Sequence, residues 1–124
     1  MNVSISGELL ESLLSFAADR HPREVIVLLR GKRADDEFEI TEFLLPPYAT
    51  GGMSFAQFPA HMLPIDFTIV GTAHSHPSGS ARPSAADLNN FYSRVMLIAA
   101  YPYGRGDVMA YNARGEPLVL QVLD

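Results

Sequence analysis

The sequence predicts a single α/β or α+β domain, spanning residues 1–124, with a mixed β-sheet flanked by helices. Short apolar runs typical of strands alternate with helical patterns, and no internal repeat or low-complexity segment interrupts them. The chain has 124 residues, of which 48% are hydrophobic and 19% are charged. A chain of this size can bury a core without disulfides or a structural metal, so we expect any metal to serve chemistry rather than folding.

The first half of the chain begins with a helix and a hairpin. Apolar residues at helical spacing follow Ser6, a suitable N-cap, and predict a helix over residues 7–18. The nearly continuous apolar run at 24–30 predicts a strand buried on both faces. Alternating residues at 37–45 predict its neighbour, with the hairpin turn at 33–36.

The second half of the chain alternates further strands with one more helix. Prolines and paired glycines at 46–64 predict a loop with one short strand and a helical turn. Ser84 followed three residues later by Asp87 forms a capping-box pattern, which predicts a helix over 84–92. Apolar runs predict the remaining strands at 67–73, 95–101, 108–111 and 118–122.

The composition excludes several classes of function. The net charge is −5 and the nine Lys and Arg residues are scattered, so we expect no nucleic-acid partner. The absence of cysteine excludes disulfides, thiolate zinc ligands and a cysteine nucleophile. No apolar run is long enough to span a membrane, and residues 1–10 lack the features of a signal peptide. We therefore expect a cytoplasmic protein with no membrane partner.

Two histidines and an aspartate form a candidate metal site. His74 and His76 lie two residues apart at the end of a predicted strand, so both imidazoles point to one face. The loop that follows is rich in Pro, Gly and Ser and can return Asp87 to the same point. Two histidines, one carboxylate and a water complete a catalytic zinc site with one open position. A His-x-His pair alone is more often incidental, and Asp87 alone can be a helix cap, but their combination favours the metal site.

Glu24 is the candidate for the group that accepts a proton from the attacking water. It begins a buried apolar strand, where a carboxylate is rare unless it faces a site. An exposed strand-end residue beside Arg23 is an equally good interpretation. His21 and His61 are not assigned to the metal, because histidines in turns and short helical pieces are more often polar surface or cap residues.

The chain resembles the JAMM (MPN+) metalloprotease family. The family pattern is a Glu, then His-x-His, seven residues, Ser, two residues and Asp, and it is matched without a gap by Glu24, His74, His76, Ser84 and Asp87. The segments 21–31 and 68–76 are similar to the first and central strands of the family. The resemblance covers essentially the whole chain.

This resemblance implies a cytidine-deaminase-like fold and one zinc ion per chain, held by His74, His76 and Asp87. It implies hydrolysis of isopeptide or peptide bonds after the C-terminal glycine of a ubiquitin-like modifier or sulfur-carrier protein. Glu24 is then the general base, and Ser84 donates a hydrogen bond to the oxyanion. The insertions of linkage-selective relatives correspond to the short 49–58 stretch and to a tight connection at 101–107, which suggests a minimal, stand-alone enzyme of archaeal or bacterial type.

The candidate substrate-binding residues are Met53, Ser54 and Phe55. A flexible tail ending in Gly-Gly can add as a strand to an edge formed by residues 53–58, with main-chain hydrogen bonds giving affinity. The small residues Gly51 and Gly52 leave room for this approach. A mobile surface loop is an equally good interpretation of this segment.

The alternative function is a non-catalytic MPN-type module that binds a ubiquitin-like partner. Such relatives typically lack one or more ligands, whereas this chain has a residue of the right type at each position of the pattern. An amidohydrolase barrel needs about 250 residues, and deaminases of related fold hold zinc through cysteines. The length of the chain and its lack of cysteine exclude both.

Overall fold

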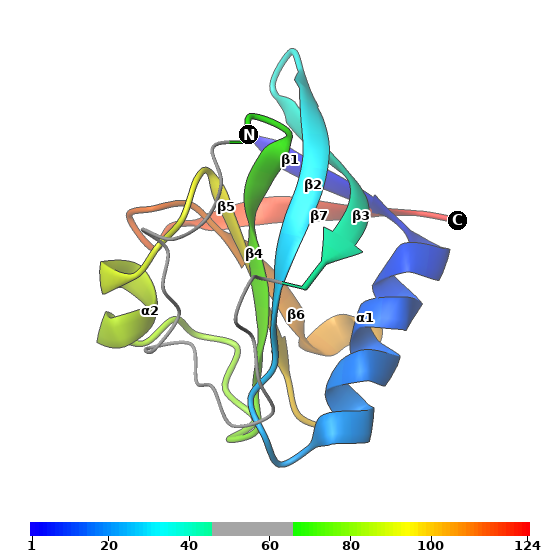
Figure 1. Ribbon diagram of the computed structural model, residues 1–124, viewed down its shortest axis with the longest axis vertical. Coiled ribbons are helices and arrows are strands. Elements are labelled where there is room, and N and C mark those ends of the chain that lie inside the picture. Colours follow the sequence, from blue (N-terminus) through cyan, green and yellow to red (C-terminus); the bar gives the residue numbers. More distant parts are fainter. Residues whose placement is uncertain (46–65) are drawn as a thin grey trace.

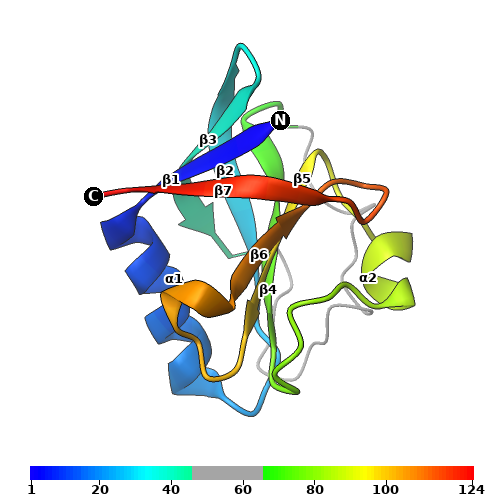
Figure 2. The same cartoon turned by 180° about the vertical axis from the view of Figure 1, so that it is seen from behind.

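The chain folds as a mixed β-sheet that closes on itself, in the order β1-β3-β2-β4-β5-β6-β7 (Figures 1 and 2). This computed structural model describes residues 1–45 and 66–124. The strands are β1 (Asn2–Ser6), β2 (Ile26–Ala34), β3 (Glu37–Leu44), β4 (Ile69–His76), β5 (Val95–Ala100), β6 (Val108–Tyr111) and β7 (Pro117–Leu123). The helices are α1 (Gly7–Arg20), α2 (Ala85–Asn89) and the short 3-10 helix η3 (Arg105–Asp107).

The pairing of the strands is mixed. Strand β1 is parallel to both β3 and β7, and β4 is parallel to β5, whereas the other pairs are antiparallel. The predicted α+β class with a mixed sheet is therefore confirmed. Within the residues that the structure describes, no helix combines the length and apolar character needed to cross a membrane.

The sheet has an inner face, which encloses the main core with α1, and an outer face, against which α2 lies (Figure 1). Helix α1 begins at its N-cap Ser6, whose Oγ accepts a hydrogen bond from the Leu9 amide at 3.0 Å. The main core is formed by buried apolar side chains that include Leu10, Leu13, Val27, Leu29, Ala73, Leu97, Val108 and Ala110. Met96 and Ile98 of β5 form a separate cluster on the outer face, and Leu88 and Phe91 pack against it.

Most of the predicted elements are present. Strand β2 runs from Ile26 to Ala34 rather than over 24–30, which shortens the turn predicted at 33–36 to residues 35–36. Three further corrections concern β1, the second helix and β4. Strand β1 was not predicted, and it forms because distant strands pair with it on both sides. The second helix ends at Asn89 rather than at 92, because the backbone of its C-cap residue Asn90 (φ −108°, ψ 21°) leaves the helical conformation. Strand β4 runs from Ile69 through His76, three residues beyond the end predicted at 73, so both histidines lie within the strand. The loop predicted at 46–64 lies outside the described residues.

Strand β4 lies between β2 and β5, and all eight of its residues are buried. The Cβ of an alanine at Gly71 would overlap the backbone carbonyl oxygen of Val95. Gly71→Ala is therefore expected to lower the free energy of unfolding by about 3 kcal/mol or more, measured by urea denaturation. Gly106→Ala is the matched control, because nothing lies within 4 Å of its Cβ, and a change within about 1 kcal/mol is expected. Equal effects of the two variants would contradict this packing of β4.

Candidate active site

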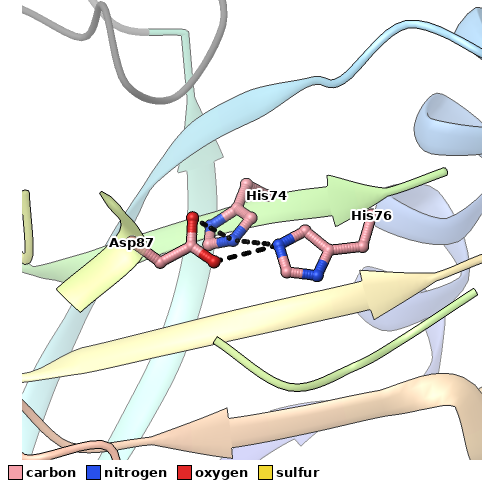
Figure 3. A group of neighbouring side chains, drawn as sticks. All are labelled: His74, His76 and Asp87. Carbon is pink, nitrogen blue, oxygen red and sulfur yellow. Dashed lines mark hydrogen bonds and ion pairs between the residues drawn. The ribbon is translucent and has the colours of Figure 1, made fainter. Parts of the chain in front are cut away.

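Three side chains converge on the outer face of β4 (Figure 3). His74 and His76 come from β4, and Asp87 comes from α2. The two Nε2 atoms lie 3.1 Å apart. The Asp87 carboxylate lies with Oδ1 3.4 Å from His74 Nε2 and Oδ2 3.0 Å from His76 Nε2. The structure thus brings together the three ligands proposed from the sequence, which are separated by up to thirteen positions along the chain.

The alternation of β4 sets the direction of the two imidazoles. Residues two apart on a strand share a face, so His74 and His76 point outward while Ala73 points into the main core. The loop after β4 folds back because the Ser80 carbonyl accepts a hydrogen bond from His76 Nδ1 at 2.7 Å. The Tyr111 hydroxyl donates to the Ala81 carbonyl at 2.7 Å and holds the same loop to β6.

A capping box places the Asp87 carboxylate. The Ser84 amide donates to Asp87 Oδ2 at 2.7 Å, and Ser84 Oγ accepts from the Asp87 amide at 3.1 Å. This bond to Ser84 Oγ leaves the hydroxyl proton able to donate elsewhere. Helix capping and metal binding by Asp87 are therefore compatible, because one carboxylate oxygen can accept the amide while the group still faces the histidines.

The donor atoms of this cluster fit a metal ion. The Ser80 carbonyl can only accept, so His76 Nδ1 carries a proton and the Nε2 of the neutral ring carries a lone pair. That lone pair faces Asp87 Oδ2 and His74 Nε2, so a proton or a metal ion between the three groups offsets their repulsion. Ligands bonded at 2.0–2.2 Å to a tetrahedral ion lie about 3.3–3.6 Å apart. The observed separations of 3.0–3.4 Å are close to this value.

The charges in the cluster are coupled. Burial lowers the pKa of His74, although the Asp87 carboxylate acts against this. Burial also opposes the charged form of His76, but bonds to Asp87 and the Ser80 carbonyl raise its pKa above the ordinary value. Burial acts to raise the pKa of Asp87, yet the bonds to both histidines hold it far below its usual range. Asp87 is therefore ionised, and its negative charge favours a positive charge beside the imidazoles, either a proton on His76 or a bound metal ion.

Glu24 lies just before β2, and its side chain is exposed. In the β2–β4 register Ile26 is opposite His74, and continuing this register places Glu24 beside His76. The charge of Glu24 acts to raise the pKa values of both histidines, after the larger effects of burial and Asp87. Glu24 is thus an exposed residue at the end of β2 that lies near the histidines, and its role as proton acceptor stays a prediction.

Other candidate residues lie away from this cluster or outside the described residues. His21 bonds through Nδ1 to the Tyr103 hydroxyl at 2.7 Å and does not join the metal-type cluster. Met53, Ser54, Phe55 and His61 lie outside the described residues, so tail docking along 53–58 stays a prediction. Ser75 was given no role from the sequence, although its position between the two histidines, pointing to the opposite face, is a signal that singles it out.

The fold and the site define a small α+β protein with a metal-ligand centre of the metalloprotease type. The chain belongs to the family of prokaryotic homologues of the JAB domain, whose model matches residues 6–114. A relative from Haloferax volcanii, called a probable metalloprotease, is 39% identical over 129 residues, covering 98% of this chain and 80% of the relative.

Solved structures support the same assignment. A JAB1/MPN domain protein from Archaeoglobus fulgidus is 34% identical, with a TM-score of 0.70 and complete coverage of both chains. A structure reported as "JAMM: A Metalloprotease-like Zinc Site in the Proteasome and Signalosome" is 30% identical, with a TM-score of 0.71 and complete coverage of both chains. Protein DSY2949 from Desulfitobacterium hafniense shares the fold at 19% identity, with a TM-score of 0.68 and coverage of 97% and 92%. The resemblance to the JAMM/MPN family is confirmed.

Proposed function

We propose that this protein is a zinc-dependent peptidase that cleaves isopeptide or peptide bonds after the C-terminal glycine of a ubiquitin-like modifier or sulfur-carrier protein. The observation that carries the proposal is the convergence of His74, His76 and Asp87, with Glu24 beside them. The relative called a probable metalloprotease and the structure reported as a metalloprotease-like zinc site support the same chemistry.

His74, His76 and Asp87 hold the ion in this proposal. A bound zinc ion supplies Lewis acidity, which lowers the pKa of water from about 15.7 to near 7 and polarises a carbonyl. The Ser80 carbonyl fixes the tautomer of His76 so that Nε2 is available as a ligand. Asp87 stays ionised because both imidazoles face it, and so it contributes a negative charge to the site.

Glu24 and Ser84 act on the substrate in this proposal. Glu24 accepts a proton from the attacking water and passes it to the leaving amine as the C–N bond breaks. For an isopeptide, the leaving group is a lysine ε-amine. The Ser84 hydroxyl donates a hydrogen bond to the oxyanion that develops on the scissile carbonyl. The exposure of both Glu24 and Ser84 leaves them accessible to a substrate.

The direct test is cleavage of defined conjugates. Small ubiquitin-like proteins ending in Gly-Gly are joined to a partner through a lysine isopeptide or a linear peptide bond, and products are identified by mass spectrometry. We expect cleavage after the terminal glycine, loss of cleavage with a chelator, and recovery on adding zinc. Matched conjugates in which the modifier ends in Ala-Ala test whether cleavage requires the Gly-Gly tail. Tight binding of the conjugate by the zinc-loaded protein without cleavage would favour the interaction module, and neither binding nor cleavage would reject the substrate class.

Ser84→Ala tests the oxyanion role. Loss of one donor to an oxyanion costs about 10²–10³ in kcat in other hydrolases, and we expect a fall of that size with zinc still bound. The variant also removes the N-cap of α2, so the matched control is Ser6→Ala, which removes the N-cap bond of α1 away from the site. If both variants lower kcat equally, Ser84 acts only as a cap.

A further inference from the structure

The position of Glu24 is set by its backbone. Among residues 1–45 and 66–124, no hydrogen bond or ion pair to the Glu24 carboxylate is present. A general base must nevertheless lie within hydrogen-bond reach of the proton that it accepts. Whatever fixes the chain on either side of Glu24 therefore fixes the proton acceptor relative to the histidines.

Ser75 binds the residue that follows Glu24. Its side chain is fully buried, with 0% exposure, and strand alternation points it away from the face of His74 and His76. Ser75 Oγ accepts a hydrogen bond from the Val25 amide at 2.9 Å, and the Ser75 amide donates to the Val25 carbonyl at 3.1 Å. The hydroxyl thus takes the place of a backbone acceptor and prolongs the β2–β4 pairing beyond Ile26.

An aromatic cluster holds the other end of the same segment. His21 Nδ1 bonds to the Tyr103 hydroxyl at 2.7 Å, and its ring stacks on Tyr101 with ring centroids 4.5 Å apart. The Tyr101 amide donates to the His76 carbonyl at 3.1 Å. The segment 21–25 is therefore tied at its two ends to residues that are themselves hydrogen-bonded to, or part of, β4.

We propose that Ser75 is a positioning residue, which fixes Glu24 relative to His74 and His76 from the inner face of the sheet, and that Tyr103 supports the other end of the segment. The catalytic consequence rests on the proposed function. Misplacement of a reacting group by about 1 Å can cost about 100-fold in rate. Loss of the Ser75 hydroxyl is thus expected to reduce turnover without removing any ligand of the ion.

The test compares Ser75→Ala with Ser93→Ala, which removes a comparable serine bond to the Ile69 carbonyl at the opposite end of β4. For Ser75→Ala we expect kcat about 10- to 100-fold lower, KM unchanged and zinc content unchanged. We also expect hydrogen exchange of the Val25 amide to be at least about tenfold faster. Ser93→Ala should leave all four quantities near the wild-type values.

A double-mutant cycle separates positioning from general support of the fold. In a Glu24→Gln background, Ser75→Ala is expected to cause almost no further loss of kcat, because its effect passes through Glu24. An equal loss in both backgrounds, or unchanged exchange of the Val25 amide, would overturn the proposal. Tyr103→Phe removes only a hydroxyl, and it replaces Ser75→Ala in this cycle if Ser75→Ala fails to fold. It should lower kcat in the wild-type background alone, and an equal loss with Glu24→Gln would again overturn the proposal.

The same experiment distinguishes this inference from the proposed function. If the wild-type protein cleaves no conjugate, the peptidase function is wrong, and with it the catalytic consequence. The exchange of the Val25 amide still decides whether Ser75 holds this segment in place. If the wild type cleaves and Ser75→Ala cleaves equally well, only the positioning role is wrong.

Discussion

Glu24→Gln is expected to lower kcat by about 10²–10⁴-fold while leaving zinc bound. The glutamine has nearly the same shape, but its amide cannot accept and return a proton at neutral pH. Because Glu24 is exposed and is not among the three clustered ligands, its neutralisation should leave the metal cluster and the free energy of unfolding almost unchanged. The measurement combines kcat from conjugate cleavage with zinc content of the same preparation.

Glu37→Gln, at the start of β3, is the matched control for this variant. It removes one half-buried carboxylate from another strand end without altering the site, and kcat should stay within about twofold of the wild type. Full activity of Glu24→Gln would remove the proton-transfer role of Glu24. Loss of zinc from Glu24→Gln would instead make Glu24 part of the metal site.

Asp87→Asn is expected to weaken zinc binding much more than Glu24→Gln does. Asparagine keeps an oxygen that can accept the Ser84 amide, so α2 retains its capping contact, but the negative charge between the two histidines is lost. We expect zinc affinity to fall by at least about 100-fold and cleavage to become undetectable at limiting zinc. Competition with a chromophoric chelator measures the affinity, and circular dichroism checks that the fold is retained.

Asp107→Asn provides a closely matched control. Asp107 accepts the Gly104 amide at 2.9 Å at the start of η3, in the same way that Asp87 accepts the Ser84 amide, but it lies outside the metal-type cluster. Its replacement should leave zinc affinity unchanged. Equal zinc affinity in Asp87→Asn and the wild type would show that the carboxylate serves only as a helix cap.

Local signals in the sequence predicted the clustering of His74, His76 and Asp87, because strand and cap geometry are local. Alternation along β4 put His74 and His76 on one face, and the capping box of α2 both began the helix and aimed Asp87. The resemblance to the JAMM/MPN family favoured Glu24 as the proton acceptor over the alternative of an exposed strand-end residue. Glu24 is far from the other candidates along the chain, and the pairing of β2 with β4 places it near the histidines.

The features that were missed depend on long-range pairing. Strand β1 has only five residues, and its pairing with β3 and β7 joins the two ends of the chain. The early end of α2 depends on the non-helical backbone of Asn90, which its residue type does not specify. The role of Ser75 requires knowing that Val25 lies opposite it, and this register is visible only once the strands are paired.

Anomalous diffraction from a crystal grown with zinc tests the central claim most directly. The account predicts a single strong peak at the zinc edge, about 2.0–2.2 Å from Nε2 of His74, Nε2 of His76 and an oxygen of Asp87. A zinc-saturated crystal with no peak at this cluster, or with the two imidazoles and the carboxylate turned apart, would contradict it.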